Sequence, residues 1–108
     1  MKDELFLRGA QVPMTKEAVR ALALAKLELH RARHLIDIGA GTGSVSIEAA
    51  LQNPALRVTA IERQADALRL LAEHRQRFGC DNIAIVAGVA PLAVADDTEG
   101  DGEHEPAV

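Results

Sequence analysis

Three glycines at every second position mark the stretch of this sequence best suited to bind a ligand. Gly39, Gly41 and Gly43 follow the short apolar run 35–38 and precede the helical pattern 45–51. A strand-to-helix turn of this kind lets backbone N–H groups and a helix N-terminus approach a polar ligand closely. We therefore expect the turn 39–43 to form a binding site. The competing interpretation is that the glycines only permit a tight bend with positive φ.

Two acidic residues lie at sequence distances from this turn that suggest a role in binding a ligand. Glu62 ends a second apolar run, nineteen residues after Gly43, where a carboxylate can accept hydrogen bonds from both hydroxyls of an adenosine ribose. Asp37, two residues before Gly39, can orient the turn or face a cationic ligand group. A dinucleotide fingerprint requires glycine or alanine where Ser44 stands, so the spacing disfavours a NAD-dependent dehydrogenase.

Alternating strand and helix patterns place these residues. The chain is 48% hydrophobic but only 2% aromatic, which is typical of a helix-covered parallel sheet with an aliphatic core. We expect strands over 35–38, 57–62 and 82–87, the first of them covered on both faces. The order βαβαβ predicts an α/β fold, the N-terminal half of a doubly wound parallel sheet with strands in the order 3-2-1 and flanking helices.

Helices are expected over 15–29, 45–51 and 66–78. Thr15 is the expected N-cap of the first helix. The buried positions of the first helix include Val19, Leu22 and Leu29. The third helix is expected to end at Gly79, and the residues of its buried face are Leu68, Leu71, Ala72 and Phe78.

Charge and cysteine content narrow the class of protein. The formal net charge is -4, but six acids lie in 96–108, which contains no Lys or Arg, so residues 1–95 carry twelve bases and ten acids. Neither part suggests nucleic acid as a partner. A single cysteine and the lack of a long apolar run favour a cytoplasmic protein without a membrane span. We divide the chain into an extended N-terminal segment (1–14), a cofactor-binding half-domain (15–95) and an acidic tail (96–108) expected to be disordered.

The four histidines, His30, His34, His74 and His104, have neither a motif partner nor metal-ligand spacing. We expect each to be a surface or capping residue, and we expect no metal site.

The set formed by Asp37, Gly39, Gly41, Gly43 and Glu62 resembles the cofactor site of class I methyltransferases that use S-adenosylmethionine. More specifically, the sequence resembles the family of cobalt-precorrin-6B C-15 methyltransferases (decarboxylating), also found as the C-terminal half of fused precorrin-6Y methyltransferases. The segments that carry this resemblance are 3–6, 12–20, 35–48, 58–63 and 88–91.

This resemblance implies a Rossmann-like fold and methyl transfer from S-adenosyl-L-methionine to C-15 of a cobalt-precorrin, with loss of CO2 from the C-12 acetate. It implies that Thr15 touches the cofactor from the N-terminal side and that Ala90 borders the adenine. It also implies that the turn 39–43, including Ala40 and Thr42, wraps the methionine and ribose of the cofactor, and that Glu62 holds the ribose hydroxyls. It also suggests a functional link to the precorrin C-5 methyltransferase. The catalytic groups are not identified.

Two departures from the family pattern affect these expectations. Val89 stands where the family usually has an acid, which puts cofactor affinity in question. The family continues through a fourth strand and a glycine-rich substrate loop, so we expect about half of the catalytic domain to be missing, through truncation or a change of reading frame shortly after Pro91. The chain would then be inactive alone, and the open edge of strand 35–38 would cause homo-oligomerisation or poor solubility.

Two rival functions stay open. One is a methyltransferase for another small molecule or for RNA. The other is a nucleotide-binding module or remnant that no longer catalyses a reaction.

Overall fold

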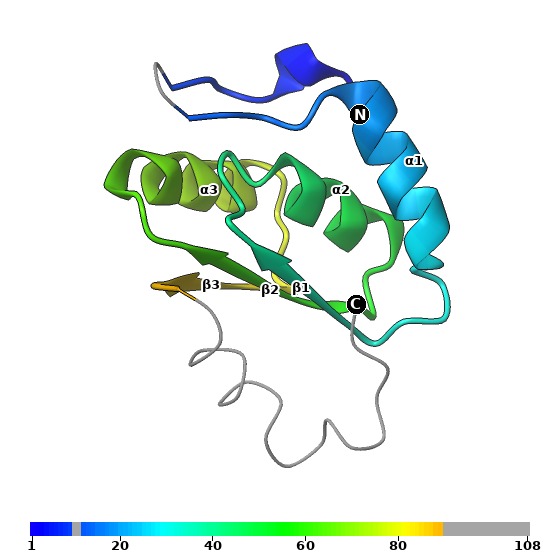
Figure 1. Ribbon diagram of the computed structural model, residues 1–108. Helices are drawn as coiled ribbons and strands as arrows, with labels where there is room; N and C mark the ends of the chain where they lie inside the picture. The colour runs from blue at the N-terminus through cyan, green and yellow to red at the C-terminus, as the bar shows by residue number, and fades with distance from the viewer. Residues whose placement is uncertain (10–11, 90–108) are drawn as a thin grey trace.

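The computed structural model describes residues 1–9 and 12–89 (Figure 1). Ala90 and the tail 96–108, for which expectations were stated above, lie outside the described residues. The elements in chain order are a 3-10 turn η1 (Asp3–Leu5), α1 (Glu17–Leu27), β1 (His34–Ile38), α2 (Ser44–Gln52), β2 (Arg57–Glu62), α3 (Ala65–Arg77) and β3 (Ile83–Ala87).

The three strands form a parallel sheet in the order β1-β2-β3, with Ile36 opposite Thr59 and Thr59 opposite Ala84. Both crossover helices, α2 and α3, lie on the same side of this sheet (Figure 1). Two right-handed crossovers that advance in the same direction must place their helices on one face. The predicted strand order and the α/β fold class are therefore confirmed.

An aliphatic core fills the layer between the sheet and these helices. Its members come from all three strands and from the helices, and they include Leu35, Ile47, Val58, Ala60, Leu71 and Ile83. Each of these side chains is at most 4% exposed. The strands and α2 thus hold the turn 39–43 on a rigid base.

The expectation that β1 is covered on both faces is wrong for its carboxyl end, because Ile38 is 63% exposed. Since the two crossover helices share one face, they cannot cover the side chains that point the other way. Within the described residues, β1 pairs with β2 alone, so its second edge is unpaired.

The first helix differs from its prediction in its buried face. The N-cap residue is Lys16 rather than Thr15, and it forms no side-chain capping bond. Val19 and Leu22 are 58% and 60% exposed, so both were wrong, whereas Leu29 beyond the helix is buried as expected. The residues that α1 buries are Arg20 and Leu24. A search for apolar periodicity assigns an arginine to the solvent-exposed face of a helix. It therefore predicts the wrong buried face for α1.

The predicted buried face of the third helix, α3, is also partly wrong. Leu71 is buried as predicted and Gly79, with φ +66°, follows the helix end, but Ala72 is exposed and Leu68 and Phe78 are only partly buried. The buried stripe is Ala67, Leu70, Leu71 and His74. A histidine occupies the position where the pattern required an apolar residue.

Two of the histidine expectations are wrong. His34 and His74 are 1% and 0% exposed, and His34 Nε2 lies 2.8 Å from Thr59 Oγ1. His30 is exposed as expected, and His104 lies outside the described residues. In the described part of the chain, no three His, Cys, Asp or Glu side chains are grouped as metal ligands.

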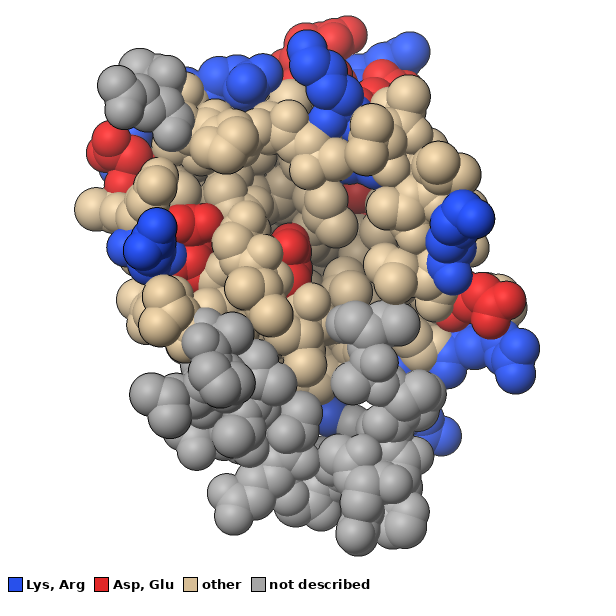
Figure 2. Space-filling view, viewed as in Figure 1, with Lys and Arg blue, Asp and Glu red and all other residues tan. Residues whose placement is uncertain are grey.

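On the face shown in Figure 2, Lys and Arg side chains are scattered around the margin and do not form one continuous patch. None of the helices described here has the length and apolar character needed to cross a membrane.

Candidate functional site

The turn 39–43 leaves the carboxyl end of β1 and enters α2 (Figure 1). Its first half is bonded to the neighbouring strand, because the N–H groups of Gly39 and Ala40 both donate to the Ile61 carbonyl, over 2.8 and 3.1 Å. The N–H of Gly43 donates to the Ala40 carbonyl over 2.9 Å and closes the turn on itself. The sheet therefore determines the path of the turn.

The three glycines are required for different reasons, although all have positive φ. A Cβ on Gly43 would lie 2.2 Å from Cδ1 of Leu71, and one on Gly41 would lie 2.9 Å from the Pro13 carbonyl oxygen. A Cβ on Gly39 would meet no atom within 4 Å. Gly43 thus allows α3 to pack, Gly41 allows the N-terminal segment to pass over the turn, and Gly39 borders open space where a ligand can lie.

Glu62, at the end of β2, is joined to this turn. Its Oε1 accepts from the N–H of Gly41 over 2.8 Å. Its Oε2 accepts from the N–H groups of Arg63 and Gln64 over 3.0 and 2.9 Å. Each carboxylate oxygen can accept two hydrogen bonds, so Oε1 retains capacity for a hydroxyl donor.

The protonation of Glu62 follows from the same contacts. Burial raises the pKa of this carboxyl, but the N–H donors of Gln64, Gly41 and Arg63 oppose it and bring the pKa below its ordinary value. Glu62 is therefore ionised at neutral pH, although it is only 7% exposed.

Asp37 has the opposite perturbation. Burial raises its pKa, the hydroxyl of Ser46, which donates to Oδ2 over 2.6 Å, lowers it, and the charge of Glu62 raises it again. The result is a pKa above the ordinary value. A cation placed between the two carboxylates would relieve this repulsion, so the pair favours a positively charged ligand group.

Thr42 contributes a polar atom with unused capacity. Its Oγ1 is buried and has no hydrogen-bond partner among the described residues. Buried hydroxyls are normally bonded. The Thr42 hydroxyl can therefore serve a polar ligand that enters the turn.

The expectation that backbone N–H groups of the turn face the ligand is wrong for four of them. The N–H groups of Gly39, Ala40, Gly41 and Gly43 donate to protein acceptors, as described above. A pyrophosphate would need such donors to be free. The geometry thus adds a second argument against a dinucleotide, beside the presence of Ser44.

The remaining residues discussed from the sequence lie less close to the turn 39–43. The Thr15 side chain is exposed, and its carbonyl accepts a hydrogen bond from Nη1 of Arg20. The part of the N-terminal segment that meets the turn is Pro13. Val89 is 58% exposed, just beyond Gly88, whose N–H donates to the Glu62 carbonyl over 2.9 Å.

Two buried polar residues make long-range contacts that the sequence analysis did not predict. Arg20 is fully buried, and its guanidinium joins Asp3 (Nη1 to Oδ1, 2.8 Å) and Glu48 (Nε to Oε1, 3.3 Å). His74 joins the turn to the N-terminal segment. No local pattern identifies either residue, because their partners lie far away along the chain.

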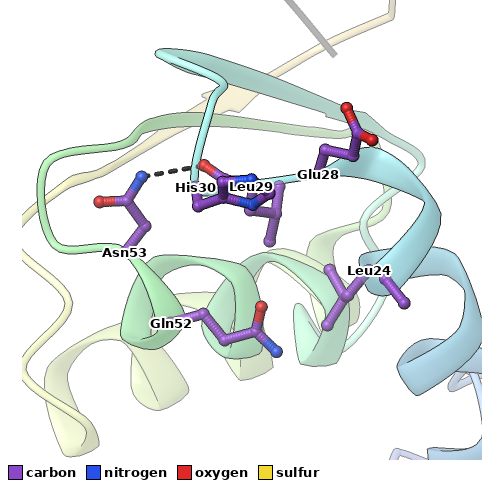
Figure 3. Close-up of a pocket in the computed structure, with 7 residues that line it drawn as sticks. Leu24, Glu28, Leu29, His30, Gln52 and Asn53 are labelled. Carbon is purple, nitrogen blue, oxygen red and sulfur yellow. Dashed lines mark hydrogen bonds between the residues drawn. The ribbon is translucent and has the colours of Figure 1, made fainter.

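A hollow visible in Figure 3 lies at the opposite end of the molecule, between the C-terminal ends of α1 and α2. Its lining residues include Leu24, Glu28, Leu29, His30, Gln52 and Asn53. The Asn53 amide donates to the Leu29 carbonyl over 2.9 Å (Figure 3). This hollow adjoins the amino edge of the sheet, whereas ligands of parallel α/β sheets bind at the carboxyl edge.

Comparison with known proteins identifies the family of the chain. Residues 4–102 match a family model described as "Precorrin methyltransferase domain". The cobalt-precorrin-6B C(15)-methyltransferase (decarboxylating) of Salmonella typhimurium strain LT2 is 69% identical over an alignment that covers 96% of this chain and 57% of that protein.

Two solved structures are similar over 89% of this chain. The precorrin-6y C5,15-methyltransferase of Geobacter metallireducens GS-15 has a TM-score of 0.81 and 35% identity, with 51% of its chain covered. The precorrin 8W decarboxylase of Methanobacterium thermoautotrophicum has a TM-score of 0.79 and 32% identity, with 52% covered.

The chain spans about half the length of these relatives. The segments on which the resemblance was recognised end at residue 91, whereas the family model extends to residue 102, so the similarity continues beyond them.

Proposed function

The chain belongs to the family of precorrin methyltransferase domains, and on that premise we propose that the turn 39–43 and Glu62 bind S-adenosylmethionine. The observation that carries this proposal is the contact between Gly41 and Glu62, which sets an ionised carboxylate with spare acceptor capacity beside the turn. The resemblance found in the sequence to this family is confirmed by the family match and by the 69% identity to the Salmonella enzyme.

The described residues fit the parts of this cofactor. Glu62 would accept from the ribose hydroxyls, and the open space beside Gly39 would take the methionine portion. Asp37 is half-buried, and the negative charge of Glu62 acts on its carboxyl group. Asp37 would face the positively charged group of the methionine portion. Ala40 and Thr42 would line the turn, with the free hydroxyl of Thr42 available to the ligand.

Two further contacts are proposed from the family resemblance. Thr15 would approach the cofactor from the N-terminal side, and Ala90 would border the adenine. The passage of Pro13 over Gly41 supports a role for this part of the N-terminal segment.

The bound cofactor would supply an activated methyl group on a sulfonium. The chain's own contribution would be to hold that group at the carboxyl edge of the sheet, because placing reactants correctly supplies much of the acceleration in such transfers. The Salmonella relative is named for methylation at C-15 with decarboxylation. We propose the same reaction, on a cobalt-precorrin and with loss of CO2 from the C-12 acetate, for the full-length form, with this chain as the cofactor-binding half and inactive alone.

The cellular setting is proposed on the same basis. A cobalt-precorrin is the substrate, the protein acts in the cytoplasm in functional connection with the precorrin C-5 methyltransferase, and the unpaired edge of β1 leads to a homo-oligomer. A second candidate, a module that binds a nucleoside without catalysis, is favoured by the half-length of the chain relative to its relatives.

Calorimetric titration of the 108-residue chain with S-adenosylhomocysteine tests the proposal. We expect saturable binding with one site per chain, no competition from NADH, and loss of binding in Gly41→Asp, because the new side chain would meet the Pro13 carbonyl. Absence of binding at millimolar ligand would reject the cofactor site. Binding without methyl transfer to a corrinoid would agree with the half-domain.

A further inference from the structure

The imidazole of His74, on α3, is fully buried and uses both of its ring nitrogens. Nδ1 lies 2.7 Å from the carbonyl oxygen of Thr42, and Nε2 lies 2.7 Å from the backbone nitrogen of Leu7. A carbonyl can only accept and a backbone N–H can only donate. The two partners therefore require the neutral tautomer with the proton on Nδ1.

The contact with Thr42 holds the second half of the glycine turn. The first half is anchored to β2 through the Ile61 carbonyl and Glu62. The Thr42 carbonyl is instead anchored to α3, next to the point where Gly43 packs on Leu71. The turn is thus held from both sides, by the sheet and by α3.

The contact with Leu7 holds the N-terminal segment. The ring of the adjacent Phe6 meets His74 edge to face, with centroids 5.3 Å apart. Further along, the carbonyl of Pro13 lies against Gly41. One side chain thus connects two parts of the chain that converge on the turn.

We propose that His74 is a positioning residue for the cofactor, which acts by donating to the Thr42 carbonyl. This inference rests on the proposed function of the turn. The contact with Leu7 supports folding of the N-terminal segment, whereas the contact with Thr42 sets the shape of the turn that the ligand meets. The two hydrogen bonds of one ring therefore have separable consequences.

Two substitutions separate these bonds. In His74→Asn, the amide nitrogen takes approximately the place of Nδ1 and keeps the donor for Thr42, while the acceptor for Leu7 is lost. In His74→Gln, the amide oxygen reaches approximately the place of Nε2 and keeps the acceptor, while the donor is lost. The matched control is His30→Asn, at an exposed histidine remote from the turn.

The readouts are the melting temperature and the dissociation constant for S-adenosylhomocysteine. We expect both His74 variants to melt at lower temperature and His30→Asn to behave as the wild type. We expect His74→Gln to bind about five- to tenfold more weakly than the wild type, the effect of one lost hydrogen bond, and His74→Asn to bind within about twofold. Equal losses of affinity in both variants, or none in either, would overturn the proposal.

A second measurement separates this proposal from the proposed function. If the wild type does not bind S-adenosylhomocysteine, the cofactor site is rejected, and the positioning role is then read from amide hydrogen exchange at residues 41–44. We expect faster exchange there in His74→Gln than in His74→Asn, and equal rates would overturn the role. If neither variant folds, nitrogen-15 NMR of labelled histidine in the wild type decides, because a proton found on Nε2 would contradict the donation to Thr42.

Discussion

The N–H group of Gly41 donates to Oε1 of Glu62 over 2.8 Å and so joins the glycine turn after β1 to the end of β2. These residues are 21 positions apart in the chain, and the parallel pairing of the two strands brings them together at one edge of the sheet. The contact orients the carboxylate and fills one of its acceptor positions, while another stays open to a ligand.

Glu62→Gln should weaken binding of S-adenosylhomocysteine by about tenfold or more, because a hydrogen bond to a charged group is worth about 1.5–3 kcal/mol. Isothermal titration calorimetry at constant salt measures this. Glu73→Gln, an exposed acid on α3, is the control and should bind as the wild type. Equal binding by both variants would show that Glu62 does not touch the ligand.

The stability of the chain should fall in acid through Glu62. Its pKa is lower in the folded protein than in the unfolded chain, so its stabilising contribution is fully present above the unfolded value of about 4.3 and is lost as the pH falls toward the folded value. Urea unfolding between pH 3 and pH 6 should therefore show a steeper loss in the wild type than in Glu62→Gln. Parallel curves for the two proteins would contradict this account.

Asp37→Asn should stabilise the fold at neutral pH and weaken cofactor binding. The pKa of Asp37 is raised on folding, so keeping this carboxylate charged above its folded pKa costs stability, and asparagine removes that cost while it can still accept from Ser46. A higher urea midpoint at pH 7 together with weaker binding is expected. The stability gain should disappear below the unfolded pKa of about 3.9, where the wild-type carboxyl is protonated in both the folded and the unfolded state.

Gly43→Ala should mainly lose stability, whereas Gly39→Ala should mainly lose ligand binding. A Cβ at Gly43 meets Leu71 at 2.2 Å, so we expect a loss of about 3 kcal/mol or more from overpacking and the left-handed backbone. Gly39→Ala should lose only about 1–2 kcal/mol of stability, but its methyl group enters the open space and should abolish binding. Denaturant melts and calorimetry of both variants measure the difference, and the loss in Gly43→Ala/Leu71→Ala should be smaller than the sum of the two single losses.

Arg20→Met should destabilise the chain by about 3–5 kcal/mol, because it removes the buried cation that Asp3 and Glu48 share. Glu48 would then keep only the N-terminal ammonium of Met1, 2.8 Å from its Oε1. Urea unfolding measures the loss. Arg31→Met removes an exposed pair with Glu28 and should change stability by less than about 0.5 kcal/mol. A loss in Arg20→Met no larger than that in Arg31→Met would show that the buried guanidinium is not needed to hold these carboxylates.

Ile38→Lys should reduce self-association of the chain. Ile38 is 63% exposed at the carboxyl end of β1, whose second edge is unpaired within the described residues, and a lysine on an edge strand opposes pairing with another strand. Sedimentation velocity should show oligomers for the wild type and a larger monomer fraction for the variant. A monomeric wild type would reject the proposed homo-oligomer.

Local patterns were sufficient for much of the fold and for placing residues of the candidate site, whose roles toward a ligand stay predictions. Apolar runs identified β1 and β2, the glycines identified the turn 39–43, and the spacing placed Glu62 at the strand end beside that turn. These predictions succeed because strand pairing in parallel α/β units follows the order of the chain, so that sequence spacing determines which strand ends meet.

The errors in the buried faces of the helices concern polar residues in the core. The faces of α1 and α3 were misassigned because Arg20 and His74 occupy core positions, and a rule that buries only apolar side chains cannot place them there. For the same reason the contribution of His74 to the turn was not foreseen.

The sequence by itself determined the parallel α/β order and a glycine turn close to an acidic strand end, because hydrophobic periodicity and backbone freedom are local properties. Only the tertiary structure decided that Arg20 and His74 are buried and which glycine borders open space. A polar side chain can be buried only when it finds hydrogen-bond partners, and the partners here, Glu48 for Arg20 and Leu7 and Thr42 for His74, lie 28, 67 and 32 positions away.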